Sequence, residues 1–159
     1  MLVVLRGNSG SGKSAVARAV RERVERVALV QQDVVRRHVL GEGDVAGGVN
    51  IGLLEAMARY ALSHRYAVIL EGILNAARYG DMLRRLALDH PAAFFYLDVS
   101  FEETARRHGT RPEAAKFTVE AMRRWYRTRA LLGYPVERII PESSSLTATA
   151  DLLPAALVV

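Results

Sequence analysis

The chain has 159 residues, of which 50% are hydrophobic and 25% charged, as is typical of one globular domain with its own core. It contains no cysteine, which excludes disulfides and thiolate metal sites, and its four histidines lack the spacing of metal ligands. The net charge of +5 favours anionic partners; because the arginines are spread along the chain, we expect a nucleotide or phosphorylated substrate rather than nucleic acid.

The sequence shows no signal peptide, and no apolar run approaches membrane-spanning length. We therefore expect a cytoplasmic protein without a membrane partner, either a monomer or a homodimer. No repeat or linker divides the chain, so a single domain over residues 1–159 is expected.

A phosphate-binding loop follows the first apolar run. Residues 2–5 predict a buried strand, and the next segment fits the pattern G-x-x-x-x-G-K-[ST] at every specified position. Apolar residues at helical spacing continue to Val24, so strand, loop and helix follow one another as the motif requires. The candidate nucleotide-binding residues are Gly7, Asn8, Ser9, Gly10, Ser11, Gly12, Lys13, Ser14 and Ala15.

The residue types of this loop suit a nucleoside triphosphate. Glycines let backbone N–H groups approach the phosphates, and the helix that follows points its positive end at them. Lys13 adds a charge for the β- and γ-phosphates, and the Ser14 hydroxyl can bind Mg²⁺. A dinucleotide-binding pattern, Gly10-x-Gly12-x-x-Ala15 with Asp33 as ribose ligand, also fits, but it leaves Lys13 and Ser14 unexplained.

Apolar, β-branched runs alternate with helical patterns along the remaining chain. This alternation predicts an α/β fold in which helices cover both faces of a parallel sheet. Further strands are expected at 27–31, 67–71, 93–99 and 137–140. Helices are expected at 34–39, from Asn50 to about 64, at 75–89, from Ser100 with a capping box to Glu103, over 113–132 and from about 145.

Carboxylates follow the expected strands at the edge where open parallel sheets bind ligands. Asp33 is the candidate general base for an acceptor hydroxyl, and the alternative is a simple helix N-cap. Arg36 and Arg37 are placed to hold an anionic group of the acceptor. Glu71 ends an otherwise apolar strand, so it needs Mg²⁺, an acceptor hydroxyl or an arginine as a partner. Asp98 is a weaker candidate for the site, and the alternative is that it closes the strand and pairs with a lysine or arginine.

Arginines cluster in the segment 106–112, which we expect to interrupt a helix. Arg107 and Arg111, ahead of Arg106, are candidates for a lid that closes on the transferred phosphoryl group; the alternative is a solvated helix end. The glycine-rich segment 41–48 is either a surface connection or a mobile flap.

Two further segments are candidates for the pocket walls. Met122, Trp125, Tyr126 and Arg129 are either core anchors or walls of the acceptor pocket. Residues 141–144 are a plausible edge for the adenine ring, on fold analogy only.

Together these residues resemble the P-loop small-molecule kinases related to adenylate and shikimate kinases, most closely the zeta-toxin and chloramphenicol phosphotransferase branch. The similar pieces are the loop GNSGSGKS, the segment Gln32-Asp33-Val34-Val35-Arg36, the end of the third strand Leu70-Glu71-Gly72, and the arginine segment RRHGTR. The resemblance implies a five-stranded P-loop NTPase fold with strand order 2-3-1-4-5, ATP as donor, Mg²⁺ as cofactor and Asp33 as the activating carboxylate.

One position departs from the zeta-type pattern, which continues to an arginine where this chain has Asn75. The nearest arginine is Arg78, which is therefore a candidate for acceptor binding together with Asp33, Arg36 and Glu71. The departure counts against a nucleotide-sugar acceptor.

The sequence thus predicts an ATP-dependent phosphotransferase that acts on a hydroxyl of a metabolite, nucleoside or antibiotic. The catalytic candidates are Lys13, Asp33, Arg107 and Arg111, and the metal candidates are Ser14 and Glu71. Two alternatives stay open: a kinase of nucleic-acid 5′-hydroxyls, and a nucleotide-binding regulatory or toxin-like module without turnover.

Overall fold

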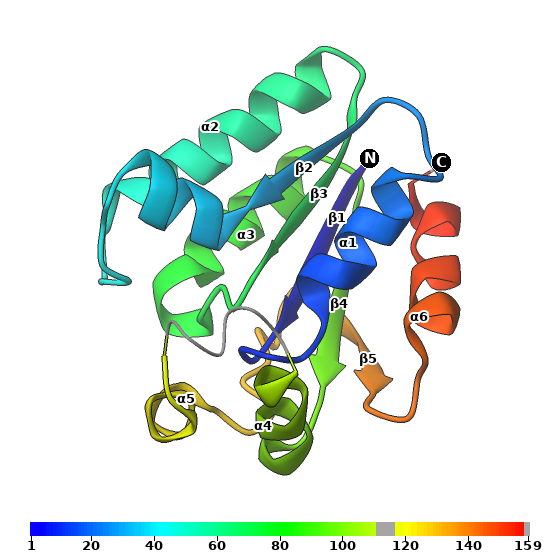
Figure 1. Ribbon diagram of the computed structural model, residues 1–159. Helices are drawn as coiled ribbons and strands as arrows, with labels where there is room; N and C mark the ends of the chain where they lie inside the picture. Colours follow the sequence, from blue (N-terminus) through cyan, green and yellow to red (C-terminus); the bar gives the residue numbers. More distant parts are fainter. Residues whose placement is uncertain (111–116, 158–159) are drawn as a thin grey trace.

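The structure is a computed structural model that describes residues 1–110 and 117–157. Its centre is a parallel sheet with the strand order β2-β3-β1-β4-β5 (Figure 1). The strands are β1 (Leu2–Gly7), β2 (Val27–Gln31), β3 (Ala67–Gly72), β4 (Ala92–Asp98) and β5 (Glu137–Pro141). The expected fold class and strand order are confirmed.

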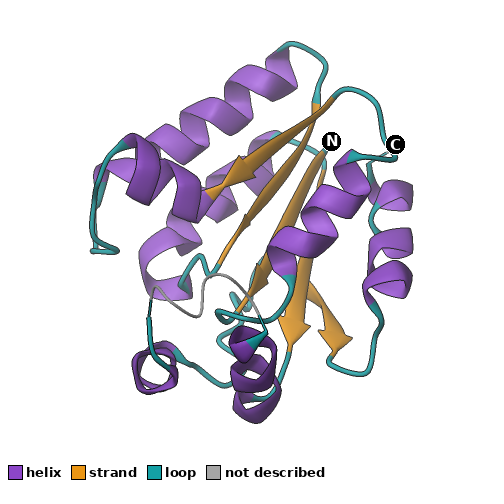
Figure 2. Cartoon of the chain, in the orientation of Figure 1, coloured by secondary structure: helices purple, strands orange, loops and turns teal. Residues whose placement is uncertain are grey.

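Helices cover both faces of the sheet (Figure 2). One face carries α2 (Val49–Ser63) and α3 (Ala76–Asp89), and the other carries α1 (Lys13–Arg21) and α6 (Leu146–Leu152). Helices α4 (Phe101–Gly109) and α5 (Val119–Trp125) lie beyond the carboxyl ends of the strands. A short π-helix, η1 (Val34–Val39), follows β2, and a 3₁₀ turn, η3 (Pro154–Ala156), lies near the C-terminus.

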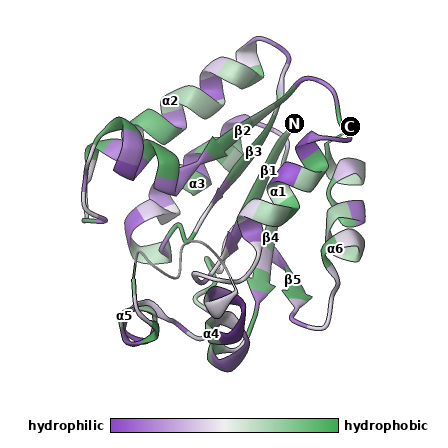
Figure 3. Ribbon diagram, in the orientation of Figure 1, coloured by the Kyte–Doolittle hydropathy of each residue, from purple (hydrophilic) through white to green (hydrophobic). Residues whose placement is uncertain are grey.

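The apolar run of β1 is buried on both sides because its side chains alternate between two cores. Leu2 and Val4 pack in the core under α2 and α3, whereas Val3 and Leu5 pack in the core under α1 and α6. Figure 3 shows the hydrophobic colour along the strands and a mainly hydrophilic α4. The aromatic residues of β4 belong to these cores: Phe94 lies in the first and Phe95 in the second.

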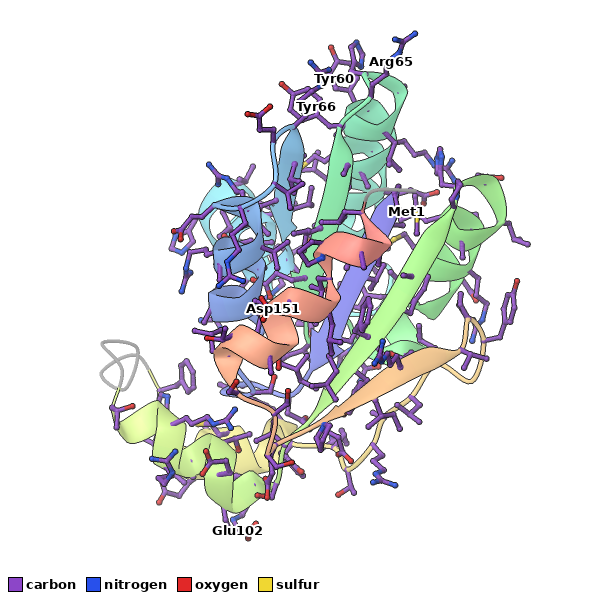
Figure 4. All side chains as sticks on the ribbon, turned by 90° about the vertical axis from the view of Figure 1, so that its right-hand side faces the viewer. Met1, Tyr60, Arg65, Tyr66, Glu102 and Asp151 are labelled. Atoms are coloured by element: carbon purple, nitrogen blue, oxygen red, sulfur yellow. The ribbon has the colours of Figure 1, made fainter. Side chains whose placement is uncertain are left out.

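The strands are in register, so their carboxyl ends meet at one edge of the sheet. Leu5 of β1 lies opposite Glu71 of β3 and Phe95 of β4. This edge carries the phosphate loop after β1, and α4 lies beside it. In Figure 4 the label of Glu102, on α4, marks this end of the molecule, while Tyr60 and Tyr66 mark the opposite end.

The helix expected over 113–132 is confirmed only over α5 (Val119–Trp125), and its continuation to 132 is wrong. Helix α5 ends at Trp125, and Tyr126 has extended backbone angles (φ −62°, ψ 134°). Polar groups of β1 and its loop bind the backbone that a continued helix would have used: Asn8 pairs with Arg127, and Arg6 donates to the carbonyl of Ala130. Residues 113–116 lie outside the described residues.

Arg6 holds this irregular segment from the middle of the sheet. Its guanidinium donates to Leu74 O (3.0 Å), Ala130 O (2.9 Å) and Glu137 Oε1 (2.7 Å). The Arg6 and Glu137 side chains are each 1% exposed. Because three parts of the chain converge on one buried cation, its loss leaves several polar groups unpaired.

The expected interruption of the helix at 106–112 is also wrong at its start, because α4 continues to Gly109. The Ser100 hydroxyl caps this helix by accepting from the Glu103 amide, as expected. The reciprocal bond of a capping box is made by another residue: Glu142 accepts from the Ser100 amide at 2.9 Å, while Glu103 pairs with Arg106 and Arg107.

The cap expected from Asn50 is wrong, because α2 starts at Val49 and its first amides are bound by Glu42. The Glu42 carboxylate accepts from Val49 N (2.7 Å), Asn50 N (2.9 Å) and Asn50 Nδ2 (2.9 Å). The glycine-rich segment 41–48 is thereby pinned to α2. Asp44 pins it again to α3, through Arg78 (2.8 Å) and Tyr79 (2.7 Å).

Candidate active site

The phosphate loop joins β1 to α1 in a conformation that requires glycine. Gly10 and Gly12 have φ values of +80° and +102°, a region that L side chains rarely adopt. A Cβ at Gly10 would also lie 2.8 Å from the Thr104 carbonyl oxygen, which packs the loop against α4. The N-terminus of α1 begins at Lys13, so its unpaired amides face the loop, as an anion site needs.

Lys13 is buried and lies along its own loop. Its Nζ donates to Asn8 O at 2.7 Å and lies 3.3 Å from Ser11 Oγ. These contacts hold the ammonium against the loop.

Ser14 and Glu71 meet below the loop. The Ser14 hydroxyl donates to Glu71 Oε1 at 2.7 Å, and Gln31 Nε2 donates to the same oxygen at 2.7 Å. Glu71 is 4% exposed, and the register of β3 with β1 and β2 puts it beside Leu5 and Gln31. The amide of Gln31 and the hydroxyl of Ser14 offset the desolvation of this carboxylate, for which the sequence left Mg²⁺, an acceptor hydroxyl or an arginine as partners.

This pair fits Mg²⁺ bound with a nucleotide. Mg²⁺ prefers oxygen ligands and usually takes one or two from the protein, the others coming from phosphates and water. No group of three or more His, Asp or Glu side chains that could hold a metal occurs within residues 1–110 and 117–157. The hydroxyl and carboxylate oxygens of Ser14 and Glu71 are therefore the candidate protein contribution.

Asp33 lies at the end of β2 with its side chain 62% exposed. It makes no capping bond to η1, so the N-cap role is not observed. Its Oδ1 instead accepts from Arg36 Nη2 at 2.8 Å and lies 3.6 Å from Arg37 Nε. The carboxylate is thus oriented by two arginines and is open to a ligand.

Most of the candidate residues around the loop line one cavity of about 660 Å³, here called the phosphate-loop cavity. Its walls include Ser9, Gly10, Gly12, Lys13, Ser14, Ala15, Asp33 and Glu71. Gly7 and Asn8 are not among its lining residues; both are buried, and Asn8 binds Arg127. The structure therefore brings the candidate lysine, metal-binding pair and general base to one space.

Two further cavities share walls with the first. The Pro141 cavity, of about 390 Å³, shares Gly12 and Ala15 with it and is bordered by Ser11, Arg107 and residues 141–146. The arginine cavity, of about 370 Å³, shares Ser9, Gln32, Asp33, Arg37, Ile73 and Phe117 with it. Asp33 therefore lies between the phosphate loop and the arginine cavity. The segment proposed for the adenine ring lies on the other side of the loop.

Arg107 lies against the phosphate loop. Its Nη1 donates to Ser11 O at 3.1 Å, its Nη2 to Glu142 O at 3.3 Å, and its Nε to Glu103 at 2.6 Å. The two arginines beside Glu103 lower the pKa of that carboxyl to about 2, with Arg106 as the larger contributor. Arg106 is 69% exposed. The other lid candidate, Arg111, lies outside the described residues.

Residues around α5 divide between core and cavity. Met122 is buried, and the Tyr126 hydroxyl donates to Val99 O at 2.9 Å, so these two anchor the segment. Trp125 is 43% exposed and lines the arginine cavity. Arg129 donates to Asp98 Oδ2 at 2.7 Å, which confirms that Asp98 pairs with an arginine.

A buried hydroxyl network behind the arginine cavity was not predicted. The Tyr79 hydroxyl lies 2.7 Å from Asp44 Oδ1 and 2.9 Å from Asn50 Oδ1, and it accepts from Gln32 Nε2 at 2.9 Å. Burial, followed by the bond to Asp44, raises the pKa of Tyr79, so the phenol stays protonated and donates. Gln32 precedes Asp33, and the network therefore fixes the end of β2 where the candidate base lies.

Sequence reasoning also missed His108, Arg124 and Arg127. His108 lines the phosphate-loop cavity, and its Nε2 lies 2.8 Å from the carbonyl oxygen of Phe117. Arg124 and Arg127 line the arginine cavity. The arginine-rich pattern of residues 123–129 was the available signal for Arg124 and Arg127. In the continuous helix that the sequence suggested, these side chains would have pointed to different sides, so no shared site was expected.

The family model described as AAA domain matches residues 2–132. A comparison with curated proteins found no match. Within residues 1–110 and 117–157, no helix combines the length and the apolar composition that a membrane crossing requires.

Several solved structures share the fold. The APS kinase of Mycobacterium tuberculosis, in complex with AMPPNP and APS, is 20% identical, with a TM-score of 0.69 over 98% of this chain and 96% of that chain. A gluconokinase from Sinorhizobium meliloti is 20% identical, with a TM-score of 0.62 over 98% of this chain and 90% of that chain.

A chain of the Pnkp1/Rnl/Hen1 RNA repair complex is also similar, at 21% identity and a TM-score of 0.65. The match covers 84% of this chain but spans only 44% of that one. The fold is therefore a P-loop kinase-like fold. Because the family model covers residues 2–132, phosphate loop and arginine cavity included, the chain belongs to the P-loop family described as AAA domain.

Proposed function

We propose that this protein transfers the γ-phosphate of ATP to a hydroxyl group of a small molecule. The observation that carries the proposal is that the phosphate-loop cavity shares lining residues with the Pro141 cavity and, through other residues, with the arginine cavity. The Pro141 cavity suits a nucleoside, the phosphate-loop cavity suits its phosphates, and the arginine cavity suits an acceptor. Asp33 lies between the second and the third.

The donor site follows from the loop. Backbone N–H groups of residues 7–15 and the N-terminus of α1 bind the phosphates, and Lys13 neutralises charge on the β- and γ-phosphates. Ser14 and Glu71 hold Mg²⁺, which neutralises charge on the phosphates when it is bound. The fold neighbour that was solved with AMPPNP supports a nucleotide as a ligand of this fold.

Asp33 is the proposed general base. The acceptor oxygen forms a bond to the γ-phosphorus while the bond from that phosphorus to the bridging oxygen of ADP breaks, and the acceptor proton passes to the Asp33 carboxylate. Arg36 and Arg37 orient this carboxylate through its Oδ1. Arg107 and Arg111 are proposed to stabilise charge on the transferred group, with Arg107 already held against the loop by Ser11.

One observation favours a second candidate, a kinase of nucleic-acid 5′-hydroxyls. The arginine cavity carries arginines from η1, α3 and the end of α5, and a fold neighbour belongs to an RNA repair complex. We favour a small acceptor because the cavity of about 370 Å³ has the size of a small-molecule site. Turnover of 5′-hydroxyl oligonucleotides, with tight and steeply salt-dependent binding, would support the nucleic-acid kinase instead.

The experiment measures transfer of labelled γ-phosphate to a panel of alcohols, sugars, nucleosides and short 5′-hydroxyl oligonucleotides. We expect a labelled product that falls at least about 100-fold in Asp33→Asn, the usual size of a lost general base. Asp81→Asn on α3, an exposed carboxylate paired with Arg84, is the matched control and should retain activity. Equal product from Asp33→Asn and the wild type would exclude Asp33 as the base.

A further inference from the structure

The wall of the arginine cavity has an excess of positive charge. Five arginines and two carboxylates line it, an excess of three charges, and they come from η1, the loop 41–48, α3 and the α5 segment: Asp33, Arg36, Arg37, Asp44, Arg78, Arg124 and Arg127. Charges of one sign in a low-dielectric cleft concentrate ligands of the opposite sign. A neutral alcohol would not use this excess.

Arg36 gives the most specific signal. It is only 9% exposed, and its Nη1 and Nη2 are committed to Glu42 O (3.0 Å) and Asp33 Oδ1 (2.8 Å). Its Nε is buried and has no hydrogen-bond partner among the described residues. A buried donor of a charged group is costly when it is left unpaired, and Arg36 is one of the residues that line the arginine cavity, so this donor points to an acceptor from outside the described residues.

Two of the five arginines, Arg36 and Arg78, are held in place by groups of the chain itself. Glu42, whose carbonyl accepts from Arg36, is fixed to the start of α2 through its carboxylate. Arg78 is held by Asp44, which in turn accepts from Tyr79. A site that is ordered in advance loses little entropy on binding, and planar guanidinium groups match oxyanions.

We propose that the acceptor carries an oxyanion, either a phosphate ester or a carboxylate, which binds to Arg36 and Arg78 in the arginine cavity while its hydroxyl lies at Asp33. This inference rests on the proposed function and narrows its substrate to anionic alcohols. Ile73, Phe117 and Trp125 line the same cavity and supply apolar contacts for the short carbon skeleton between the two groups.

The test measures binding of inorganic phosphate by calorimetry to protein that is saturated with AMPPNP and Mg²⁺, so that the phosphate loop is occupied. We expect saturable binding that weakens at least tenfold in Arg78→Gln and in Arg36→Gln. Arg78→Gln is the more informative variant because Arg78 is 38% exposed and its loss is compatible with folding. Arg85→Gln, also on α3 but paired with Glu55, should bind phosphate as the wild type does.

Each result has a definite meaning. If AMPPNP does not bind, the proposed function falls, and this inference falls with it. If AMPPNP binds but phosphate does not, or binds equally to Arg78→Gln, only this inference is overturned. Citrate and a 5′-hydroxyl dinucleotide are titrated in parallel to identify the source of the oxyanion. Citrate binding that is lost in Arg78→Gln supports the subsite and assigns it to a carboxylate. Dinucleotide binding that is lost in Arg78→Gln supports the subsite and assigns it to a nucleic-acid phosphate.

Discussion

The Asn8 side chain of the phosphate loop pairs with both backbone groups of Arg127. Its Nδ2 donates to Arg127 O at 2.8 Å, and its Oδ1 accepts from Arg127 N at 3.0 Å. The two residues are 119 positions apart in the sequence. A loop that is proposed to bind the donor is thus tied to the segment that supplies Arg124 and Arg127 to the arginine cavity.

We expect Asn8→Ala to loosen this segment. Both backbone groups of Arg127 lose their partner, which costs about 1–3 kcal/mol for each buried group that stays unpaired. Hydrogen exchange measured by mass spectrometry should become faster over residues 119–130 and stay unchanged in α2. Asn75→Ala removes the cap of α3 and is the matched control, since it should affect α3 alone. Unchanged exchange over residues 119–130 in Asn8→Ala would contradict the role of the pair.

Glu71→Gln should raise the Mg²⁺ concentration needed for nucleotide binding by about tenfold or more, the size of effect expected when a partner of a bound metal is replaced. The amide keeps the shape of the side chain but removes the charge that Ser14 and Gln31 now surround. Calorimetric titration of AMPPNP at several Mg²⁺ concentrations measures the change. Glu55→Gln on α2 is the control, and an equal Mg²⁺ requirement in both variants would remove Glu71 from the metal site.

Glu137→Gln should destabilise the fold by about 3–5 kcal/mol, because it leaves the Arg6 cation buried without its counterion. The exposed pair Arg84–Asp81 offers the contrast: Asp81→Asn should cost at most about 1 kcal/mol. Urea denaturation followed by circular dichroism gives both free energies of unfolding. Similar values for the two variants would mean that the buried pair stabilises no more than a surface pair.

Glu42 should make the start of α2 sensitive to acid. Hydrogen bonds from Asn50, first from its side chain, and from Val49 lower the pKa of Glu42 below its ordinary value of 4.5. A carboxyl whose folded pKa is lowered stabilises the fold above its unfolded pKa and loses that contribution as the pH falls through the folded pKa. We expect the melting temperature to fall less between about pH 6 and about pH 3 in Glu42→Gln than in the wild type.

The control for this titration is Glu25→Gln, an exposed glutamate after α1. It should retain the full acid dependence of the wild type. If Glu42→Gln also retains the full acid dependence, the acid sensitivity comes from other carboxyls. The prediction that the Glu42 cap of α2 is lost on acidification is then wrong.

The sequence predicted those parts of the fold that are set by local patterns. The alternation of strands and helices was correct because short-range patterns determine it, although some helix ends were wrong. The strand order was also correct, but it followed from the resemblance to P-loop kinases that the loop Gly7–Ser14 and the other motifs carry. The positions of Asp33 and Glu71 at the carboxyl edge followed from strand ends alone. Their roles in the reaction stay predictions.

What the sequence could not predict depends on contacts between distant residues. Helix α5 ends at Trp125 because Asn8 and Arg6 bind backbone groups beyond it, and no local signal near residue 125 reports this. In the same way, Glu42 caps α2, and Glu142 completes the cap of α4 over a separation of 42 residues. A helix cap that comes from a residue distant in the sequence can be identified only from the folded structure.

The anchors of the segment 126–130 are mainly independent of its outward side chains. In this segment, Arg6 binds the main-chain oxygen of Ala130, and Asn8 binds the main-chain groups of Arg127. The Tyr126 hydroxyl donates to the main-chain oxygen of Val99. The Arg127 side chain does contribute, because its Nη1 donates to Arg124 O and Tyr126 O at 2.9 Å each. The neighbouring position 124 gives these bonds its carbonyl oxygen, so its side chain can change while the segment keeps its path. Under the proposed function, a library restricted to position 124 would therefore vary the preference for the acceptor on an intact scaffold.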